Sequence, residues 1–581
     1  MCGFILSINP SEENRRTFES ALRTLSHRGP DDSNTWEDAS GQCLLGHHRL
    51  SVIDLSIAGR QPYGDPSGRY HLVFNGEIYN FVELRMELRS RWDFRTQTDT
   101  EVLLAAYVVW GEHCLDRLNG MFSFAIWDSQ TKKLFAARDR FGVKPLYYSV
   151  RPNGSLLMAS EIKALHALGV SKEPDATAWR TYFTRGLYDH GPHSFFADIR
   201  AVPPGHVLRH SVSENSPEVL PWYILANRLF EQGPDPRTEE EVAEELFTLL
   251  EDAVQLRLRS DVAVGVSLSG GLDSALLLGL IREESTSEGK FQSFTFAFGD
   301  DRYDETRWTQ AMLEGSGIKA HECLVRAEEI PELASRVQAF QDEPFGGLPT
   351  LGLAKVHLRA QELGVTVLLD GNGLDEGWAG YDYYLNPHET NFDSGPVQGT
   401  THTLSLSEAL DPEFAAGPTY GLPDKPFKDA LLNLQHRDLA SSKIPRAMRF
   451  ADRVSMMASR ELREPFLDYR IVELGMRQPP DRKIRNGQGK WLPRFLAEKL
   501  LPSDIALAPK RAVQTPQREW LRGSLSAWAA SQIESALSGL GSEWFDKRNV
   551  HDTWLSYLNG DADNSFPVWQ LINFGLLKSK S

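Results

Sequence analysis

The sequence has few cysteines and no long apolar run. Its four cysteines, Cys2, Cys43, Cys114 and Cys323, are too scattered for a disulfide framework, and no Cys-X-X-Cys pair suggests a zinc site. No apolar stretch approaches the roughly 20 residues that a helix needs to span a bilayer. The opening MCGFILSINPSEENRR lacks the basic leader and long apolar region of a secretory signal. These absences predict a cytoplasmic protein without a membrane partner.

Basic residues are also in deficit. There are 62 Lys and Arg residues against 79 Asp and Glu residues, which gives a formal net charge of -17. Binding to nucleic acid depends largely on Lys and Arg contacts with phosphates, so this balance argues against a nucleic acid partner.

At 581 residues, the chain exceeds what a single core usually supports, and two domains are expected. The sequence does not give the oligomeric state, and a homodimer is one option.

Residues 1–210 have the pattern of a layered domain dominated by β-sheet. Short β-rich runs such as YHLVFN, MFSFAIWD and KLFAAR alternate with Gly, Asn and Asp turns, and one helix pattern, LRMELRS, lies between them. Residues 211–237 are rich in Ser, Pro, Glu and Gly, the composition of a linker.

Residues 238–581 change to an alternation of helix and strand. Thr238 and Glu241 resemble a capping box that opens a helix. The apolar runs VAVGVSL, SFTFAF and VTVLL, separated by helical patterns, predict a parallel sheet covered on both faces. Residues 385–430 are irregular, and residues after 520 indicate terminal helices. The expected fold class is therefore α/β and α+β in two domains.

Cys2 is a candidate nucleophile. Removal of Met1 leaves Cys2 with a thiol and an α-amine on the same carbon. The α-amine has an ordinary pKa of about 7.7 to 8.0, so a fraction of it is neutral and can accept the thiol proton. Taken alone, a small apolar side chain at position 2 is the more common explanation.

A series of motifs between residues 27 and 148 changes that balance. In order, they are HRGPDD, HHRLSVIDLS, NGEIYN, TDTE, GMFSFAIWD and RDRFGVKPLYY. This region resembles the glutaminase domain of the class II, N-terminal-nucleophile amidotransferases, an αββα sandwich that takes L-glutamine. The resemblance implies that Arg49 binds the glutamine α-carboxylate, while Glu77 and Asp99 bind its α-ammonium. It also implies that Asn75 binds glutamine and that Asn75 and the amide of Gly76 form the oxyanion hole.

A second motif, SLSGGLDSALLLGLI (267–281), lies between a buried strand and an apolar helix. Its glycines allow backbone N–H groups to turn toward phosphate oxygens, and the helix directs its positive end at the same point. The motif resembles the PP-loop of ATP pyrophosphatases, which cleave ATP between the α and β phosphates. The ATP-binding residues implied are Leu268, Ser269, Gly270, Gly271, Asp273, Ser274, Phe296, Gly371 and Lys510.

The same resemblance implies further roles around the nucleotide. Asp273 and Asp375, of the later GLDE, would share Mg²⁺ bound to the pyrophosphate, because this ion prefers oxygen ligands. Leu268 and Phe296 would pack on adenine. Lys510 in LAPKRAV matches a family lysine that contacts phosphate and stabilises the adenylation transition state. Without the motif, either aspartate is also a plausible helix cap and Lys510 a surface lysine.

A glutaminase followed by a PP-loop domain, with SRELREPFLD near the end, is similar to the B-type family of glutamine-hydrolysing asparagine synthetases. The similarity spans nearly the whole chain. It implies that Cys2 releases ammonia, which crosses an internal tunnel. ATP meanwhile converts an acceptor carboxylate, by default that of aspartate, to an acyl adenylate that ammonia attacks.

One departure from this family lies at the nucleotide site. Family members usually read Ser-Gly-Glu-Gly where this chain has Asp370-Gly371-Asn372-Gly373, and that glutamate is taken to deprotonate the attacking nitrogen. Asn372 cannot accept a proton in this way, and a general base contributes roughly 100- to 10,000-fold. Three explanations are open: Asp370 has taken over the role, the acceptor supplies its own base, or the synthetase is impaired.

A second departure is DEPFGGLPT (342–350), which lacks the Asp-Pro-Ser that often follows DEPF in the family. With Asn372, it indicates an altered acceptor site beside intact glutaminase and pyrophosphate motifs. The alternatives to an asparagine synthetase are a tailoring amidotransferase for a sugar acid or natural-product carboxylate, and a glutamine- or ATP-sensing protein that has lost synthesis.

Overall fold

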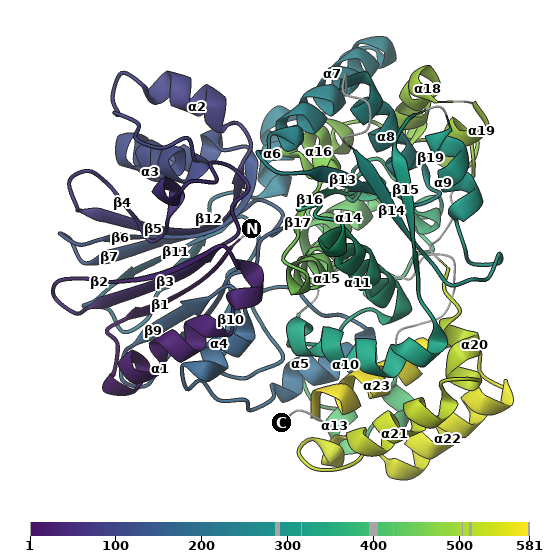
Figure 1. Cartoon of the computed structure of the whole chain (residues 1–581). Coiled ribbons are helices and arrows are strands. Elements are labelled where there is room, and N and C mark those ends of the chain that lie inside the picture. The colour runs from purple at the N-terminus through teal and green to yellow at the C-terminus, as the bar shows by residue number, and fades with distance from the viewer. Residues whose placement is uncertain are drawn as a thin grey trace.

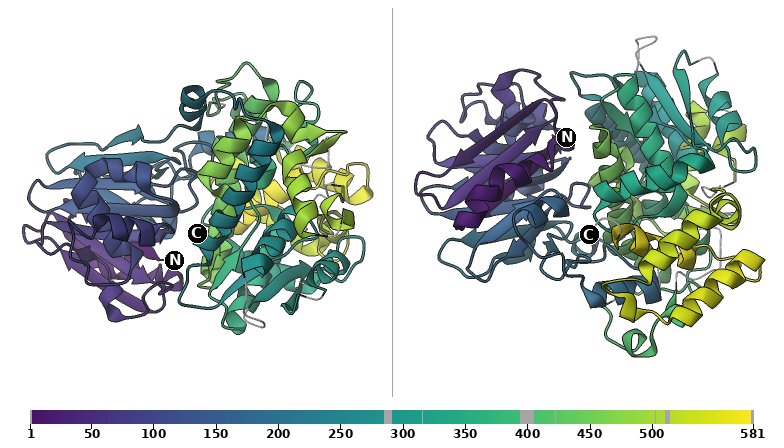
Figure 2. Two further views of the ribbon diagram at one scale, coloured as in Figure 1. Left: turned by 90° about the horizontal axis from the view of Figure 1, so that it is seen from above. Right: turned by 60° about the horizontal axis from the view of Figure 1, so that its bottom comes forward.

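The computed structural model describes residues 2–284, 291–314, 316–393, 405–421, 423–501, 503–509 and 514–578. It has two domains that lie side by side, with the N-terminal end of the chain at their boundary (Figures 1 and 2). The two-domain fold class expected from the sequence is confirmed. In these ranges, no helix has both the length and the apolar character needed to cross a bilayer.

The N-terminal domain contains two six-stranded antiparallel sheets. The strand orders are β10-β8-β9-β1-β3-β2 and β12-β11-β7-β6-β5-β4. The first sheet consists of β1 (Gly3–Ile8), β2 (Asp32–Glu37), β3 (Cys43–Arg49), β8 (Tyr147–Val150), β9 (Leu156–Ala159) and β10 (Arg200–Ala201). The second consists of β4 (Tyr63–Gly64), β5 (Tyr70–Ile78), β6 (Gly120–Asp128), β7 (Lys133–Arg138), β11 (His206–Ser211) and β12 (Glu218–Pro221).

Helices cover the outer faces of the two sheets, which completes the expected αββα sandwich. Phe4, Val73 and Trp127 pack between the sheets. Outside the first sheet lie α1 (Glu12–Arg23) and α4 (Ile162–Ala167), and outside the second lie α2 (Phe81–Leu88) and α3 (Asp99–Trp110). Only α2 was indicated by the sequence pattern. The helix α3 was missed because its first eight residues are all buried, so it has no amphipathic period.

The segment 211–237, expected as a linker, contains regular structure. Strand β12 pairs with β11 and so belongs to the second sheet of the N-terminal domain. Helix α6 (Leu225–Gln232) follows it and packs on α16 (Tyr469–Met476) of the second domain. The chain therefore crosses between the domains through a structured connection.

The C-terminal domain is built on a five-stranded parallel sheet in the order β15-β14-β13-β16-β17. The strands are β13 (Val264–Ser267), β14 (Gln292–Ala297), β15 (Lys319–Leu324), β16 (Val367–Leu369) and β17 (Glu461–Arg463). The helices around the sheet include α7 (Glu239–Leu258), α8 (Leu272–Glu284), α9 (Thr306–Leu313), α10 (Ile330–Gln341), α11 (Gly347–Glu362), α12 (Leu374–Gly377), α14 (Ala430–Arg437), α15 (Ile444–Met457) and α18 (Trp491–Leu500).

The local signals for the first helix and the central strands are confirmed. Thr238 and Glu241 form a capping box at the start of α7, and three of its apolar residues, Val242, Leu246 and Leu250, are fully buried. The apolar runs became β13, β14 and β16. The sequence pattern gave no sign of β17, whose residues Glu-Leu-Arg are buried although two of them are charged.

The end of the chain forms the terminal helices expected after residue 520. These are α20 (Gln517–Arg522), α21 (Ser526–Ala536), α22 (Lys547–Asn559) and α23 (Phe566–Lys578). They pack against α5 (Ala176–Arg185) of the first domain, where the Gln570 side chain donates to the Tyr182 carbonyl at 2.6 Å. Within 385–430, residues 394–404 and 422 lie outside the described residues, and the described part contains short helical turns and an isolated bridge from Leu410 to Phe545.

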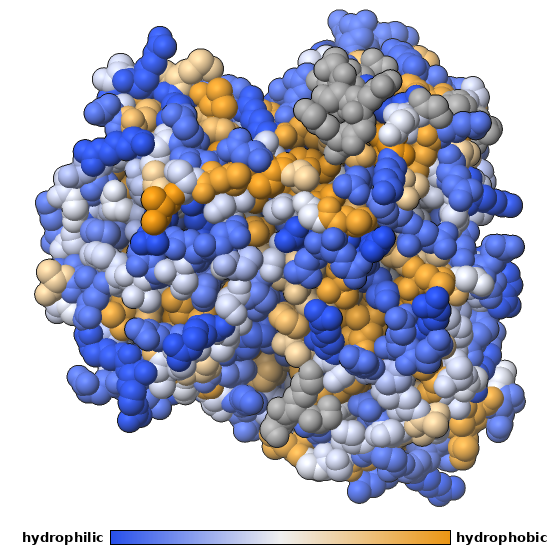
Figure 3. Space-filling view, viewed as in Figure 1, coloured by the Kyte–Doolittle hydropathy of each residue, from blue (hydrophilic) through white to orange (hydrophobic). Residues whose placement is uncertain are grey.

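Buried charges join the two domains. The fully buried guanidinium of Arg28 donates to Glu161 at 2.7 Å and to both carboxylate oxygens of Asp452 on α15, at 2.8 and 3.0 Å. Burial raises the pKa of the Asp452 carboxyl, but Arg28 outweighs that effect and holds the pKa below its ordinary value. On the outside, apolar side chains gather along the upper part of the crease between the domains (Figure 3).

Arg28→Met is expected to lower the free energy of unfolding by about 3 to 5 kcal/mol, because it leaves buried carboxylates without their partner. The measurement is urea unfolding of the full chain, followed by tryptophan fluorescence. The matched control is Arg60→Met, which removes a solvent-exposed guanidinium from its pair with Asp32 and should leave the unfolding midpoint close to that of the wild type. Equal midpoints for the two variants would contradict the importance of the buried contact.

Candidate active sites

One pocket of the N-terminal domain collects five of the residues expected to bind glutamine or to cleave it. It is lined by Cys2, Arg49, Gly76, Glu77 and Asp99, among others. Cys2 precedes β1 and Arg49 ends β3, while Gly76 and Glu77 lie on β5 and Asp99 begins α3. The two sheets and one helix therefore converge on the side chains that the motifs singled out.

The environment of Cys2 suits a nucleophile that attacks an amide. Its backbone nitrogen donates to Asn75 Oδ1 at 3.1 Å. Among the described residues, the buried Nδ2 of Asn75 has no hydrogen-bond partner, so a donor is ready for an oxyanion. Burial raises the pKa of the Cys2 thiol, which makes a nearby proton acceptor necessary. At Gly76, a β-carbon would lie 2.1 Å from the Met121 carbonyl oxygen, so only glycine fits.

Arg49 is fixed in the pocket wall by the loop that follows β3. Its guanidinium donates to the carbonyl oxygens of Ser56 at 2.7 Å, Asp54 at 2.5 Å and Ile53 at 3.3 Å. Gly59 allows this approach, because a β-carbon there would lie 2.2 Å from Arg49 Nη2. The pocket wall thus carries a cation that is held in place by the backbone.

Two carboxyl groups also line the pocket. Burial raises the pKa of Glu77 well above its ordinary value and the pKa of Asp99 to about 6, and repulsion from Asp99 raises that of Glu77 further. Asp99 accepts a hydrogen bond from the Ile78 backbone at 2.9 Å. Glu77 lies 3.7 Å from the guanidinium of Arg463, which belongs to β17 of the other domain. This acidic pair is suited to an ammonium group.

We expect the KM for glutamine to rise as the pH falls below about 6. Because the pKa of Asp99 is raised to about 6, this carboxylate loses its charge, and with it its attraction for an ammonium, as the pH falls through that value. The pKa of Glu77 is raised in the same direction. Asp99→Asn should raise KM roughly 10- to 100-fold at pH 8, the effect of a lost charged hydrogen bond, and flatten its pH dependence. Glutaminase kinetics between pH 5 and 8 provide the measurement. A wild-type KM that stays constant over this range would contradict the assignment.

The predicted phosphate loop lies between β13 and α8, at the carboxyl edge of the parallel sheet. The Ser269 backbone nitrogen donates to Ser274 Oγ at 3.1 Å, and the two hydroxyl oxygens lie 2.9 Å apart. At Gly270, a β-carbon would lie 3.3 Å from the side chains of Glu305 and Trp308. The Ser269–Ser274 contacts therefore close the loop. Its backbone N–H groups lie at the N-terminus of α8, where an anion binds favourably.

The residues expected around adenine lie on neighbouring strands. Leu268 is buried, and its backbone nitrogen bonds to the Phe294 carbonyl on β14 at 2.8 Å. Phe296, further along β14, is half-buried and packs on Gly352 of α11. Helix α11 begins at Gly347, inside the divergent DEPFGGLPT motif. That motif therefore lies on the β14 side of the loop.

Lys490 joins the two aspartates expected to bind the metal. Its Nζ lies 2.5 and 2.7 Å from the Asp273 oxygens and 2.5 Å from Asp375 Oδ1. Only 2% of Lys490 is exposed, and it adopts a left-handed backbone (φ 58°) directly before α18. The sequence analysis missed this lysine. An available signal was its place just before a helix, where Ser, Thr, Asp and Asn are usual and positive charge is unfavourable.

The donor set at this point fits Mg²⁺ that arrives with a nucleotide. Asp273 and Asp375 both contact one ammonium, so their carboxylates converge on a single cation position. Among the described residues, no group of three or more His, Cys, Asp and Glu side chains has metal-binding geometry. Phosphate and water oxygens would therefore complete the shell, as is usual for this ion. Lys510, the lysine expected here from the sequence, lies outside the described residues.

The divergent segment after β16 lies beside the loop. At Gly371, a β-carbon would approach Asp273 Cβ to 3.0 Å. Burial, followed by repulsion from Asp273, raises the pKa of Asp370 to about 6. Asn372 Nδ2 lies 3.4 and 3.5 Å from the carboxylate oxygens of Glu464, a residue that the sequence analysis did not single out. The two departures thus flank the loop, with Asn372 on the β16 side.

Lys490→Met is expected to reduce pyrophosphate release from MgATP and an acceptor by about 100- to 1,000-fold. A loss of this size is typical when one preorganised group that stabilises transition-state charge is removed. The expected cause is the loss of a cation held between Asp273 and Asp375. Lys499→Met, an exposed lysine on the same helix, serves as the control. Glutaminase activity should be unchanged in both variants. Wild-type pyrophosphate release by the Lys490 variant would show that this lysine has no part in nucleotide chemistry.

The chain matches two known family descriptions. Residues 1–223 match "Glutamine amidotransferase domain", and residues 245–579 match "Asparagine synthase". It is 31% identical to a putative asparagine synthetase [glutamine-hydrolyzing] of Mycobacterium tuberculosis, over 96% of this chain and 92% of that protein. It is 28% identical to asparagine synthetase [glutamine-hydrolyzing] 1 of Bacillus subtilis, over 99% and 96%. Amidase chry2 of Gibberella zeae is 32% identical, over 63% and 55%.

Proposed function

The chain belongs to the family of glutamine-hydrolysing asparagine synthetases, and from this premise we propose that it uses ATP to amidate aspartate to asparagine with ammonia from glutamine. The observation that carries the proposal is the single pocket that holds Cys2, Arg49, Glu77 and Asp99. It offers a nucleophile, a cation for a carboxylate and an acidic pair for an ammonium, the three features that glutamine requires.

In the glutaminase half of the reaction, the α-amine of mature Cys2 accepts the thiol proton and the thiolate attacks the side-chain amide carbon of glutamine. The negative oxygen that develops there receives hydrogen bonds from Asn75 Nδ2 and the Gly76 amide. Ammonia leaves when the C–N bond breaks, and water then releases glutamate from the thioester. Arg49, Glu77 and Asp99 hold the substrate by its α-groups throughout.

In the synthetase half, an oxygen of the acceptor carboxylate attacks the α-phosphorus of ATP, and pyrophosphate leaves. The closed loop around Ser269 and Ser274 holds the phosphates by backbone N–H groups. Lys490 stabilises the negative charge that shifts onto the leaving oxygens. Asp273 and Asp375 would hold Mg²⁺, which would neutralise charge on the pyrophosphate. Ammonia then attacks the acyl carbon and displaces AMP.

A second candidate is a tailoring amidotransferase that uses another carboxylate, such as a sugar acid. It is favoured by the two departures that flank the nucleotide loop, at Asn372 and in DEPFGGLPT. It is also favoured by similarity to a protein called an amidase. A glutamine- or ATP-sensing protein without synthesis is less consistent with a closed phosphate loop and an unpaired oxyanion donor beside Cys2.

Incubation with glutamine, MgATP and single carboxylic acids decides between these functions. We expect pyrophosphate and asparagine to form when aspartate is supplied, with pyrophosphate measured enzymatically and the amide by mass spectrometry. Pyrophosphate and an amide formed only with another acid, such as glucuronate, would identify the tailoring enzyme, and none with any acid would identify the sensor. As a control, Cys2→Ser should abolish glutamine-dependent synthesis and retain synthesis from ammonium chloride.

A further inference from the structure

The amide-forming step needs a proton acceptor that the sequence motif does not supply. When the nitrogen of ammonia bonds to the acyl carbon, it becomes positively charged and must lose a proton. In related synthetases this task is given to the glutamate of Ser-Gly-Glu-Gly, and this chain has Asn372 at that position. A carboxylate that does the same work must therefore reach the attacking nitrogen from another part of the chain.

Glu464 provides a carboxylate next to Asn372. Strands β16 and β17 are parallel neighbours with Leu369 opposite Arg463, and the Asp370 backbone nitrogen donates to the Arg463 carbonyl at 3.0 Å. The residues that follow both strands therefore emerge at the same edge of the sheet, where ligands of open parallel sheets bind. There, the carboxylate oxygens of Glu464 lie 3.4 and 3.5 Å from Asn372 Nδ2.

We propose that Glu464 is the catalytic base of the amide-forming step, and that it replaces the carboxylate absent from position 372. The inference rests on the proposed function, since it names a residue for the same reaction. The side-chain amide of Asn372 then orients Glu464 by directing its N–H group at the carboxylate.

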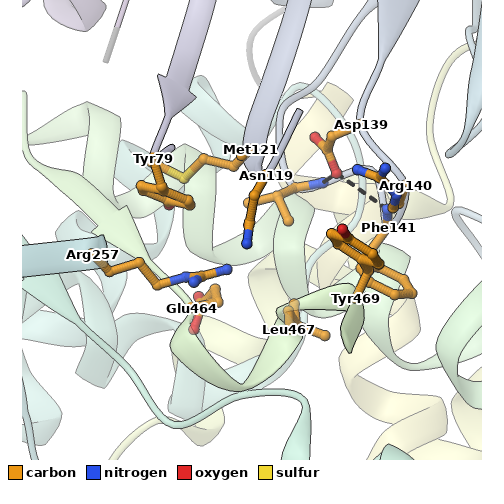
Figure 4. A pocket seen from close by; sticks show the side chains of 12 residues that line it. Tyr79, Asn119, Met121, Asp139, Arg140, Phe141, Arg257, Glu464, Leu467 and Tyr469 are labelled. Atoms are coloured by element: carbon orange, nitrogen blue, oxygen red, sulfur yellow. Dashed lines mark hydrogen bonds between the residues drawn. The ribbon is translucent and has the colours of Figure 1, made fainter. Parts of the chain in front are cut away.

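Glu464 also lines the cavity between the two domains. Tyr79, Asn119 and Met121 of the N-terminal domain form one side of that cavity, and Arg257 and Glu464 lie on the other (Figure 4). Tyr79 follows Glu77 of the glutamine pocket by two residues. Ammonia released near Cys2 and bound for the adenylate would thus approach the nucleotide site from the side on which Glu464 lies.

The surroundings of Glu464 favour its action as a base. Only 4% of the residue is exposed, and burial, followed by repulsion from Asp370, raises its pKa well above the ordinary value. A base is most effective when its pKa lies near the working pH, so a raised carboxylate value increases its affinity for the proton. The nearby Arg257 directs its guanidinium to Asp468 at 3.2 Å, so its main partner is another carboxylate.

Asp370, which the sequence analysis considered as one option for this role, lies beside the phosphate loop. Repulsion from Asp273 contributes to its raised pKa, and Gly371 beside it abuts Asp273. Asp370 therefore lies against the phosphate loop, and it is not among the residues that line the interdomain cavity. This arrangement assigns Asp370 to the nucleotide side of the sheet edge and Glu464 to the ammonia side.

The proposed step moves one proton from the attacking nitrogen to Glu464. The nitrogen lone pair forms a bond to the acyl carbon, and one proton passes from nitrogen to a Glu464 oxygen. The bond between the acyl carbon and the bridging oxygen then breaks, and its electron pair leaves with AMP. The products are the amide, AMP and protonated Glu464, which returns its proton to solvent through the cavity.

The test uses the full chain with ammonium chloride as the nitrogen source, so that glutaminase activity does not limit the rate. Glu464→Gln keeps the size of the side chain and removes the base. We expect amide formation to fall about 100- to 10,000-fold. Acceptor-dependent exchange between pyrophosphate and ATP, and glutamine hydrolysis, should stay at wild-type levels. The acceptor is the one that the wild-type enzyme amidates.

A swap of the two side chains provides the matched control. Adding Asn372→Glu to Glu464→Gln returns a carboxylate to the family position and should recover amide formation at least tenfold over Glu464→Gln. Amide formation by Glu464→Gln at the wild-type rate would overturn the proposal. Loss of both pyrophosphate–ATP exchange and glutamine hydrolysis in this variant would also overturn it, because it would show that Glu464 has a structural role. A wild-type enzyme that makes no amide from any acid would overturn the proposed function and this inference with it, whereas the first two results overturn the inference alone.

Discussion

The relative position of the two domains depends on charged side chains that are buried at the domain boundary. Arg28 of the first domain holds Asp452 of the second through two hydrogen bonds, and both residues are buried. A buried guanidinium that lost its partner would be strongly unfavourable, so the domains have one preferred arrangement. That arrangement brings a glutamine pocket and a nucleotide site to either side of a shared cavity.

Strand β17 connects the two chemistries. Its first and last residues, Glu461 and Arg463, are buried and pair with each other at 2.6 Å. Arg463 also approaches Glu77 of the glutamine pocket, and the next residue, Glu464, reaches Asn372 beside the nucleotide loop. A three-residue strand at the edge of the sheet thus contacts both sites, which gives a physical route by which occupancy of one can affect the other.

Much of the fold could be predicted because its signals are local. The central strands β13, β14 and β16 are short apolar runs, and α7 carries its own capping box. The elements that escaped prediction lack such signals. Helix α3 is buried around its first two turns. Strand β17 consists mainly of charged residues, and Arg463 also donates to the carbonyl of Arg257, which is distant in sequence.

The sequence by itself determined the chemical inventory: a cysteine at position 2 with its ordered motifs, and a Ser-Gly-Gly-Leu-Asp-Ser loop between strand and helix. Tertiary structure alone decided which distant residues join them. Lys490 meets Asp273 across 217 positions, and Glu464 meets Asn372 across 92. A motif reflects residues that are close in sequence. These contacts form only because β16 and β17 end at the same edge of the sheet and α18 begins beside it.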